Sequence, residues 1–372
     1  MSTPALFQPI RLRDVTVRNR IAVAPMCQYL AVDGVPGAWH RAHHARFALG
    51  GVGMVIAEAT GVTRDGRISP GCTGLWNDTQ VAAWKEITDL HRAHGVISGI
   101  QINHSGGKGS TARPWEGAGP LVPGSAEPPW ETVAASAIAM RPGWHVPRPA
   151  TIPEIEEIVH AFGLAAQRAV AAGFDTVEIH GAHGYLLHTF NSPLTNQRAD
   201  AFGGSRENRM RLPFLVAEEV RRAIPEGMPL LYRGSFLDNI EGGVTLEDSI
   251  ALARGLKARG VDLVDCSAGG VVAPVSLLQQ KMEHGYQVPI AEALRREAGL
   301  PSMAVGLITD PVLANAYVAS GRCDMVALAR EMISDASWPY RAAIALGHPE
   351  PESVLPLGYG FYLERRAKTQ GR

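Results

Sequence analysis

The sequence predicts a single parallel (β/α)8 barrel, and three observations lead to this prediction. Eight short apolar runs recur along the 372 residues, stretches of helical period lie between them, and glycine-bounded turns separate the two kinds of segment. Strands and helices that alternate in this way form a parallel sheet. Because α/β barrels of this length are routinely single domains, we expect residues 1–372 to form one domain.

The eight expected strands follow one another at regular intervals and are rich in apolar residues. In chain order they are Ile21–Ala24, Met54–Ala59, Val96–Ile102, Thr176–Ile179, Leu230–Tyr232, Leu263–Val264, Met303–Val305 and Met325–Leu328. Helices are expected between them, because apolar residues recur at helical spacing from Ile155 to Ala169 and from Leu246 to Leu256.

Capping residues mark the starts of three of these helices. The pairs are Thr151 with Glu154, Thr245 with Asp248, and Asp310 with Pro311. Helices then end at glycine, and the chain enters the next strand through the similar turns Gly173-Phe174-Asp175, Gly260-Val261-Asp262 and, more loosely, Gly321-Arg322-Cys323-Asp324. We interpret these segments as repeated βα units of one barrel.

Two long segments interrupt the repeat. Residues 103–150, after the third strand, are rich in Pro, Gly and Trp, and residues 180–209 follow the fourth strand. Long loops after barrel strands crown the face where catalysis occurs, so we expect residues 103–150 to form a cap or lid. Residues 351–372 form a separate C-terminal segment.

Composition excludes several classes of partner. The net charge of -1 offers no electrostatic basis for binding nucleic acid or an anionic membrane. We find no signal peptide and no apolar run long enough to span a bilayer, and therefore expect a cytoplasmic protein. Four scattered cysteines, Cys27, Cys72, Cys266 and Cys323, argue against disulfides and against zinc or iron–sulfur sites. Small molecules and further copies of the chain remain as partners.

One apparent dinucleotide motif fails in context. Gly107-x-Gly109-x-x-Ala112 follows a strand, but Arg113-Pro114-Trp115 cannot continue a helix. A nicotinamide dinucleotide must therefore bind without a Rossmann site.

The most informative segment is His180-Gly181-Ala182-His183-Gly184-Tyr185, at the end of the fourth strand. Two neutral imidazoles can donate N–H groups to one carbonyl or nitro oxygen, and the phenol of Tyr185 is a weak acid. This combination suits hydride attack on an enone. A metal site is the less favoured alternative, because zinc requires three or four ligands and no carboxylate or thiol is spaced to join the histidines.

Several motifs together closely resemble the old yellow enzyme family of FMN-dependent ene-reductases, across nearly the whole chain. Besides the two histidines and Tyr185, they are Pro25-Met26-Cys27-Gln28-Tyr29, Glu58-Ala59-Thr60, Gln101-x-x-His104, Asn191-Ser192-Pro193-Leu194-Thr195-Asn196 and Asp200-Ala201-Phe202-Gly203-Gly204-Ser205-x-Glu207-Asn208-Arg209. Cys27 with Tyr29 resembles the thermophilic-like branch, which includes the xenobiotic reductases.

The resemblance implies an activity and a set of site residues. His180 and His183 would bind the activating oxygen of the substrate with Tyr29 and Tyr362 nearby, and Tyr185 would protonate Cα after hydride reaches Cβ. NADPH or NADH would act as reductant and leave before the alkene enters the same pocket. The tightly bound, non-covalent FMN would contact Pro25, Met26, Cys27, Ala59, Gln101, His180, Arg233, Gly306, Ala329 and Arg330. Enones, enals, maleimides and nitroalkenes would all be substrates.

Residue chemistry supports part of this assignment independently. Barrels often bind phosphate after strands seven and eight, where Gly306 and Ala329 offer N–H groups and Arg330 a planar fork. Arg233 ends the fifth strand, inside the barrel, where an unpaired charge is costly.

Near the C-terminus, the resemblance implies a homodimer or homotetramer in which Tyr362 or Arg365 reaches a neighbour's active site.

Alternatives and departures remain. The alternatives are a 2,4-dienoyl-thioester reductase-like flavoenzyme, a cofactor-free phosphate-binding aldolase or isomerase, and a barrel that only binds flavin or ligand. The departures are Gly107, where the family frequently has arginine, Asn191 in place of an apolar residue, and the unusual Gly234-Ser235-Phe236. They affect the preference for substrate and cofactor, not the fold.

Overall fold

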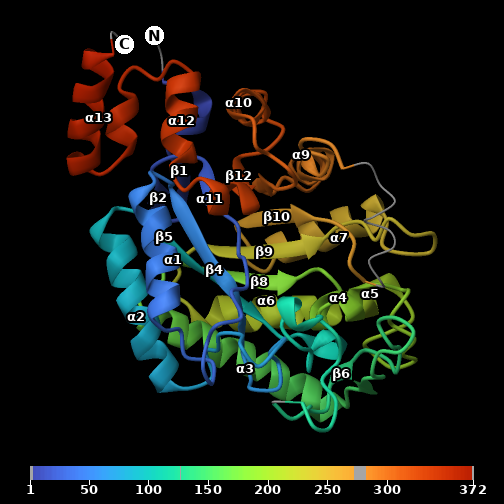
Figure 1. Ribbon diagram of the computed structural model, residues 1–372. Helices are drawn as coiled ribbons and strands as arrows, with labels where there is room; N and C mark the ends of the chain where they lie inside the picture. Colours follow the sequence, from blue (N-terminus) through green and yellow to red (C-terminus); the bar gives the residue numbers. More distant parts are fainter. Residues whose placement is uncertain (1–2, 126, 272–281, 371–372) are drawn as a thin grey trace.

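The computed structural model describes residues 3–125, 127–271 and 282–370, and its centre is a closed barrel of eight parallel strands (Figure 1). The predicted barrel is thereby confirmed. Around the barrel the strands run in the order β10-β11-β12-β3-β4-β5-β8-β9. They are β3 (Ile21–Val23), β4 (Met54–Gly61), β5 (Ile97–Asn103), β8 (Thr176–Gly181), β9 (Leu230–Ser235), β10 (Leu263–Ser267), β11 (Ser302–Ala304) and β12 (Met325–Leu328).

Apolar side chains fill the interior of the barrel, and a short hairpin lies at one end. β1 (Ile10–Leu12) and β2 (Val15–Val17) pair antiparallel, and their Leu12 and Val17 join one buried cluster with Met54, Leu231 and other residues of the barrel strands. An eight-stranded barrel has an interior just wide enough for side chains, so this end is packed solid. A cavity is therefore expected only beyond the carboxyl ends of the strands.

Strand register brings polar residues together inside the barrel. Gln101 of β5 is paired with Glu178 of β8, and Arg233 of β9 is paired with His180 on one side and with Asp265 of β10 on the other. Because residues paired in register point to the same face of a sheet, and residues two apart in a strand do so as well, these five side chains share the inner face. β4 carries a register shift between Ala57 and Thr60, next to the site.

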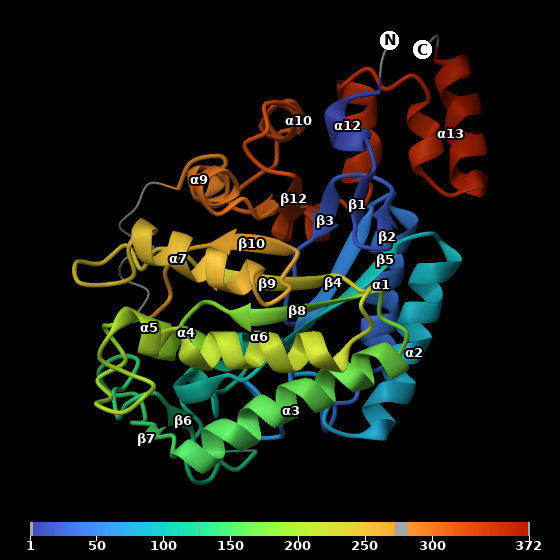
Figure 2. The same cartoon turned by 180° about the vertical axis from the view of Figure 1, so that it is seen from behind.

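Helices cover the outside of the barrel, as Figure 2 shows from behind. They are α1 (Ala38–Leu49), α2 (Asp78–Ala93), α3 (Ile152–Ala171), α6 (Arg211–Ala223), α7 (Leu246–Lys257), α9 (Val288–Ala298), α10 (Pro311–Ala319), α11 (Arg330–Ser334) and α12 (Trp338–Ala345). All three predicted caps are confirmed, since the side chains of Thr151, Thr245 and Asp310 accept hydrogen bonds from the third residue of each helix.

The two interrupting segments contain only short elements. Residues 104–150 include η2 (Gly106–Lys108), η3 (Pro114–Glu116) and the parallel pair β6 (Val133–Ala134) and β7 (Arg148–Pro149). The segment after β8 forms α4 (Leu186–Asn191) and α5 (Arg206–Arg209), and β6 contacts α4. Both segments therefore meet beside the turn that carries His183 and Tyr185.

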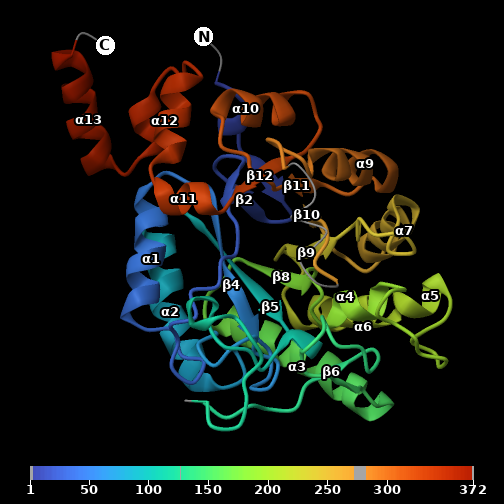
Figure 3. The ribbon, with the colours of Figure 1, turned by 45° about the vertical axis from the view of Figure 1, so that its right-hand side comes forward.

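At the other end of the chain, η4 (Pro351–Val354) and α13 (Leu357–Thr369) follow α12, and α13 stands on the outside of the barrel (Figure 3). Its Leu357 and Tyr362 side chains are 89% and 72% exposed. None of the helices in the described residues has the length and apolar character needed to cross a bilayer.

Candidate active site

A cavity of about 480 Å³ opens beyond the carboxyl ends of the strands. β9 and β10 contribute Arg233 and Ser267, the loops after β11 and β12 contribute Gly306, Ala329 and Arg330, and His183 closes one side. Its volume falls within the range of about 300–1,000 Å³ that is typical of ligand sites. It is thus the first candidate for the position of a cofactor.

Arg233 is the central charge of this cavity. Its Nη1 lies 3.0 Å from Asp265 Oδ2, and the Arg233 side chain is only 10% exposed. The contact of Nη1 with Asp265 is an ion pair without hydrogen-bond geometry, and within the described residues neither Nε nor Nη1 of Arg233 makes a hydrogen bond, although both are buried. A buried guanidinium with unused donors requires an acceptor, so this wall is suited to a ligand edge that carries oxygen or nitrogen lone pairs.

Two carboxyl groups and one amide surround Arg233. Gln101 Nε2 donates to Glu178 Oε1 at 2.7 Å. Burial, with the nearby charge of Asp265, raises the pKa of Glu178 to about 8, and burial also raises the pKa of Asp265. Since one arginine balances two carboxyls, the cluster favours keeping a proton at neutral pH. Gln101 was predicted to face the ligand edge, and it reaches this cluster.

The predicted phosphate residues line the same cavity. Gly306 has a φ of +118°, and a Cβ there would lie 2.9 Å from Tyr286 Cε1. Glycine is therefore required where the chain turns away from β11. Ala329 caps α11, and Arg330 is its first residue. All three residues lie where barrels commonly bind phosphate.

The histidine pair converges on one point. His183 Nδ1 lies 3.4 Å from His180 Nε2, and the two rings are nearly perpendicular. His180 Nδ1 accepts from the backbone N–H of Ala182, so the proton of the neutral ring is on Nε2. Burial and the charge of Arg233 lower the pKa of both histidines well below the ordinary value, so both are neutral.

Ser267 can set the proton position of the second histidine. Its Oγ lies 2.8 Å from His183 Nε2, with the side-chain amide of Gln287 nearby. If Ser267 donates to Nε2, the proton of the neutral His183 ring is on Nδ1, next to His180 Nε2. Both rings can then donate to the same acceptor.

Tyr185 stands over His180, with ring centroids 4.9 Å apart, and packs with Cys27 and Tyr29 against Ala59 and Cys72. Burial raises the pKa of Tyr185, so the phenol keeps its proton until a stronger base forms beside it. Burial raises the pKa of Tyr29 as well. A hydrogen bond with Cys72, together with burial, holds the pKa of Cys27 well above its usual value. All four cysteines are free thiols in the structure.

Lys108 ties the turn to the neighbouring loop. Its Nζ donates to His183 O at 2.5 Å and to Gly270 O at 2.6 Å, and it lies 5.6 Å from the centre of the Tyr185 ring. Burial lowers the pKa of this amine to about 8. The ammonium group of Lys108 therefore lies beside Tyr185, the weak acid of this turn.

A second cavity, of about 160 Å³, extends from Tyr29, Lys108 and Tyr185 into the insertion. Besides Lys108, six insertion residues line it: Thr111, Ala112, Pro114, Ala118, Met140 and Trp144. The outer wall of the site thus comes from the segment predicted as a lid.

The structure brings most of the predicted site residues together, with one exception. Pro25 and Met26 lie just beyond β3, after Ala24, and Ala59 lies in β4 beside Cys27. Tyr362, in contrast, is exposed on α13 and lines neither cavity described above. Sequence reasoning missed Lys108 and Ser267. A polar ending of the sixth strand, Asp265-Cys266-Ser267, could have indicated Ser267.

The departures from the family pattern have local explanations. A Cβ on Gly107 would lie 2.9 Å from Pro147 Cγ, so the insertion occupies the space of a side chain there. Asn191 is buried at the end of α4, and its carbonyl accepts from Arg209 Nε. In Gly234-Ser235-Phe236, a Cβ on Gly234 would lie within 2.6 Å of the Phe236 ring. Packing thus accounts for the glycines at 107 and 234, and nothing in the structure explains the asparagine at 191.

Comparisons with known proteins agree with this geometry. The model of the NADH:flavin oxidoreductase / NADH oxidase family matches residues 5–347. An NADPH dehydrogenase of Geobacillus sp. (strain WCH70) is 42% identical over 351 residues, which cover 94% of this chain and 96% of that protein.

Solved structures agree as well. An old yellow enzyme homologue from Zymomonas mobilis superposes with a TM-score of 0.74 at 28% identity, over 91% of this chain and 92% of the other. Morphinone reductase in complex with tetrahydroNAD gives a TM-score of 0.75 at 26% identity, over 92% and 91% of the two chains.

The chain therefore belongs to the NADH:flavin oxidoreductase / NADH oxidase family, and the resemblance to old yellow enzymes is confirmed. It is an oxidoreductase for which the family implies FMN and a reduced nicotinamide dinucleotide. The unused donors of Arg233 and the cradle at Gly306 fit such a flavin. Within the described residues, no cluster of His, Cys, Asp and Glu could hold a metal ion.

Proposed function

We propose that this protein reduces carbon–carbon double bonds activated by a carbonyl or nitro group, with NADPH or NADH as reductant. The convergence of His180 Nε2 and His183 Nδ1, 3.4 Å apart beside Tyr185, is the observation that carries the proposal. Two neutral donors and one neutral acid are the groups needed to polarise an enone and to protonate it.

The histidines bind the activating oxygen. His180 donates from Nε2, because its Nδ1 accepts from Ala182 N. His183 donates from Nδ1 when Ser267 donates to its Nε2. Both N–H groups withdraw electron density from the conjugated system, so Cβ becomes a better hydride acceptor.

Tyr185 supplies the proton. Its Oη–H is transferred to Cα once Cβ has received a hydride, and the phenolate that remains is reprotonated from solvent. One alkene, one NAD(P)H and one proton give one saturated product and NAD(P)+. The Lys108 ammonium lowers the energy of the phenolate, since it lies 5.6 Å from the ring.

FMN supplies the hydride chemistry when bound. Arg233 and Gln101 would hold the pyrimidine edge of the flavin; Pro25, Met26, Cys27 and Ala59 would pack against the ring system, where His180 also lies. Gly306, Ala329 and Arg330 would hold the phosphate. This assignment is supported by the cavity that Arg233 shares with the three phosphate residues.

We further propose that residues 103–150 act as the substrate wall, with Tyr29 on its inner side, since the insertion lines the cavity beside Tyr185. The exposed apolar residues of α13, with Tyr362 among them, support the proposal that a second copy of this chain packs there in a homodimer or homotetramer. Arg365 follows on the same helix and would face the partner.

Anaerobic stopped-flow absorbance tests the proposal. The purified protein is reduced with NADPH and then mixed with 2-cyclohexenone, and wild type is compared with Tyr185→Phe. We expect the flavin absorbance to bleach and return, and Tyr185→Phe to slow only the return, by about 10²–10⁴-fold. A colourless protein, or a flavin that NADPH does not reduce, would refute the proposal.

A further inference from the structure

The turn that carries His183 and Tyr185 has an unusual backbone. His183 has a φ of +60° and Gly184 a φ of +75°, so two successive residues are left-handed. For a residue with a side chain this conformation is costly, and it persists only where the surroundings enforce it. The contacts of this backbone should therefore show what enforces the turn.

Two of these contacts come from neighbouring strands and loops. His183 N–H donates to Ser235 Oγ at 2.9 Å, and Ser235 in turn donates to Gly269 O at 2.7 Å. On the other side, Lys108 holds the carbonyl of His183. The peptide groups on both sides of His183 are thus tied to other parts of the barrel.

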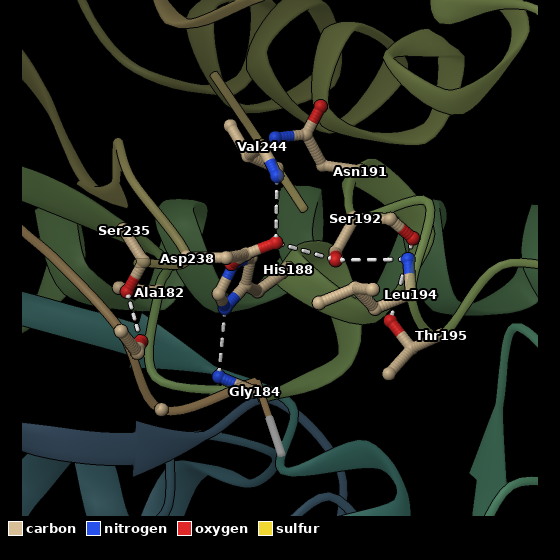
Figure 4. A network of polar contacts seen from close by, with 12 residues as sticks. Ala182, Gly184, His188, Asn191, Ser192, Leu194, Thr195, Ser235, Asp238 and Val244 are labelled. Atoms are coloured by element: carbon tan, nitrogen blue, oxygen red, sulfur yellow. Dashed lines mark hydrogen bonds and ion pairs between the residues drawn. The ribbon is translucent and has the colours of Figure 1, made fainter. Parts of the chain in front are cut away.

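The third contact comes from helix α4 and is buried throughout (Figure 4). Gly184 N–H donates to His188 Nδ1 at 2.9 Å, and His188 Nε2 lies 2.9 Å from Asp238 Oδ1. The side chains of His188 and Asp238 are both 0% exposed. Because a backbone N–H can only donate, His188 Nδ1 carries no proton, and the Nε2–H must donate to Asp238.

Asp238 is held as a carboxylate by three donors. Besides His188, Ser192 Oγ donates to Oδ2 at 2.7 Å and Val244 N at 2.8 Å (Figure 4). Burial raises the pKa of Asp238, but the hydrogen bonds from His188, Ser192 and Val244 outweigh it, and the net pKa is lowered. A charged Asp238 accepts only, so it fixes which nitrogen of His188 holds the proton.

The hydrogen bond from Gly184 to His188 affects the site because it lies at the start of helix α4. Tyr185 is the N-cap of α4, and His188 is three residues further along. In a capping box the third helical side chain reaches back to the N-cap N–H. Here His188 reaches one residue further, to Gly184, and so fixes the peptide that joins His183 to the rest of the turn.

We propose that His188 and Asp238 are positioning residues of the active site: the couple presents an acceptor to Gly184 N–H and thereby holds His183 and Tyr185 in their working orientation. The effect on substrate binding rests on the proposed function, whereas the hydrogen bonds of His188 and Asp238 do not depend on it. It predicts that the position of the acceptor atom in residue 188 matters more than the size of the side chain.

Two substitutions separate acceptor position from size. In His188→Asn the amide oxygen takes the place of Nδ1 and can accept from Gly184, whereas nothing reaches Asp238. In His188→Gln the amide takes the place of Nε2 and can donate to Asp238, but Gly184 N–H has no acceptor. Glutamine is closer in volume to histidine, so a role in packing alone would favour it.

Two readouts are used on the flavin-loaded protein. The first is the affinity for 4-hydroxybenzaldehyde, followed through the flavin absorbance, because its phenolate oxygen can accept from both histidines. For His188→Gln we expect the affinity to fall about tenfold, because one buried N–H lacks an acceptor. For His188→Asn we expect the affinity to fall by less than about threefold. The second is hydrogen exchange of the peptide that contains Gly184, which should become faster in His188→Gln only.

His91→Asn serves as the control for losing a buried imidazole. His91 is fully buried and contacts Ser98 and His44 rather than the turn, so neither readout should change. If neither His188 variant folds, Ser192→Ala removes one donor from Asp238 and should weaken phenolate binding by about threefold with the flavin potential unchanged.

Equal behaviour of the two His188 variants, or better binding in His188→Gln, would overturn the inference. Wild-type protein that binds no phenolate would instead count against the proposed function. In that case the exchange of Gly184 still decides the inference, because it does not depend on a ligand.

Discussion

Arg233 and Asp265 face each other from adjacent strands, with Nη1 3.0 Å from Oδ2 inside the barrel. Removing one partner would leave the other charge buried. We therefore expect Arg233→Met to lower the free energy of unfolding by about 3–5 kcal/mol, and Arg233→Met with Asp265→Leu to recover most of the loss. Urea unfolding at fixed pH, with flavin content determined in parallel, measures both. A double variant no more stable than the single one would contradict this.

Glu178 should make stability depend on pH. Its pKa is raised from 4.5 to about 8, so the folded protein binds this proton more tightly than the unfolded chain. The contribution is fully present below the ordinary pKa of 4.5 and is lost as the pH rises through about 8. Glu178→Gln mimics the protonated form and should melt about 2–4 °C higher than wild type above this pH. Identical melting curves at all pH values would refute the assignment.

Lys108 should give the alkene-dependent step its own pH dependence. Since its pKa is lowered to about 8, the ammonium group loses its charge as the pH rises through that value. The phenolate of Tyr185 then loses a stabilising cation, and we expect the rate of flavin reoxidation by 2-cyclohexenone to fall about tenfold. In Lys108→Met the rate should be low throughout and lack this break. Stopped-flow measurements at a series of pH values show whether the break belongs to Lys108.

Gly107 should not tolerate even a methyl group. A Cβ there would lie 2.9 Å from Pro147 Cγ and 3.2 Å from Pro147 Cβ. We expect Gly107→Ala to lower the free energy of unfolding by about 1–3 kcal/mol through overpacking, and a second substitution, Pro147→Ala, to restore part of it. Thermal unfolding of the two single variants and the double variant gives the coupling. Additive losses would show that the two residues do not compete for space.

Much of the fold could be predicted because its signals are local. Strand runs and the caps at Thr151 and Thr245 depend on neighbours within a few residues, and the structure confirms them. The strand ends are less precise: β12 (Met325–Leu328) has the expected bounds, and the other seven strands differ from theirs by one to three residues at an end. For example, residues 303–305 were expected, and β11 is Ser302–Ala304. The order of the strands around the barrel followed from the fold class, not from any single residue.

The contacts that hold the site could not be predicted, because they join distant parts of the chain. Lys108 meets carbonyls 75 and 162 residues away, and His188 meets Asp238 across 50 residues. His188 also lies in an apolar helical run, Leu186-Leu187-His188-Thr189-Phe190, where periodicity shows only a buried position. Its role becomes visible only when the closed barrel brings β9 and the loop after it to α4.

The two cavities are lined by different kinds of structure, and the sequence of the outer lining can therefore vary more freely. Barrel strands and the hydrogen-bonded turn at His183 supply residues around the inner cavity, with Arg233 at its centre. The turn leaves no room for a larger residue, because a Cβ on Gly184 would lie 2.3 Å from Gly270 O. The outer cavity is lined mainly by an insertion with few regular elements. On the proposed function, we therefore expect substitutions at Thr111, Met140 or Trp144 to change substrate selectivity while the residues around Arg233 and His183 are preserved, which makes this wall the natural target for directed evolution.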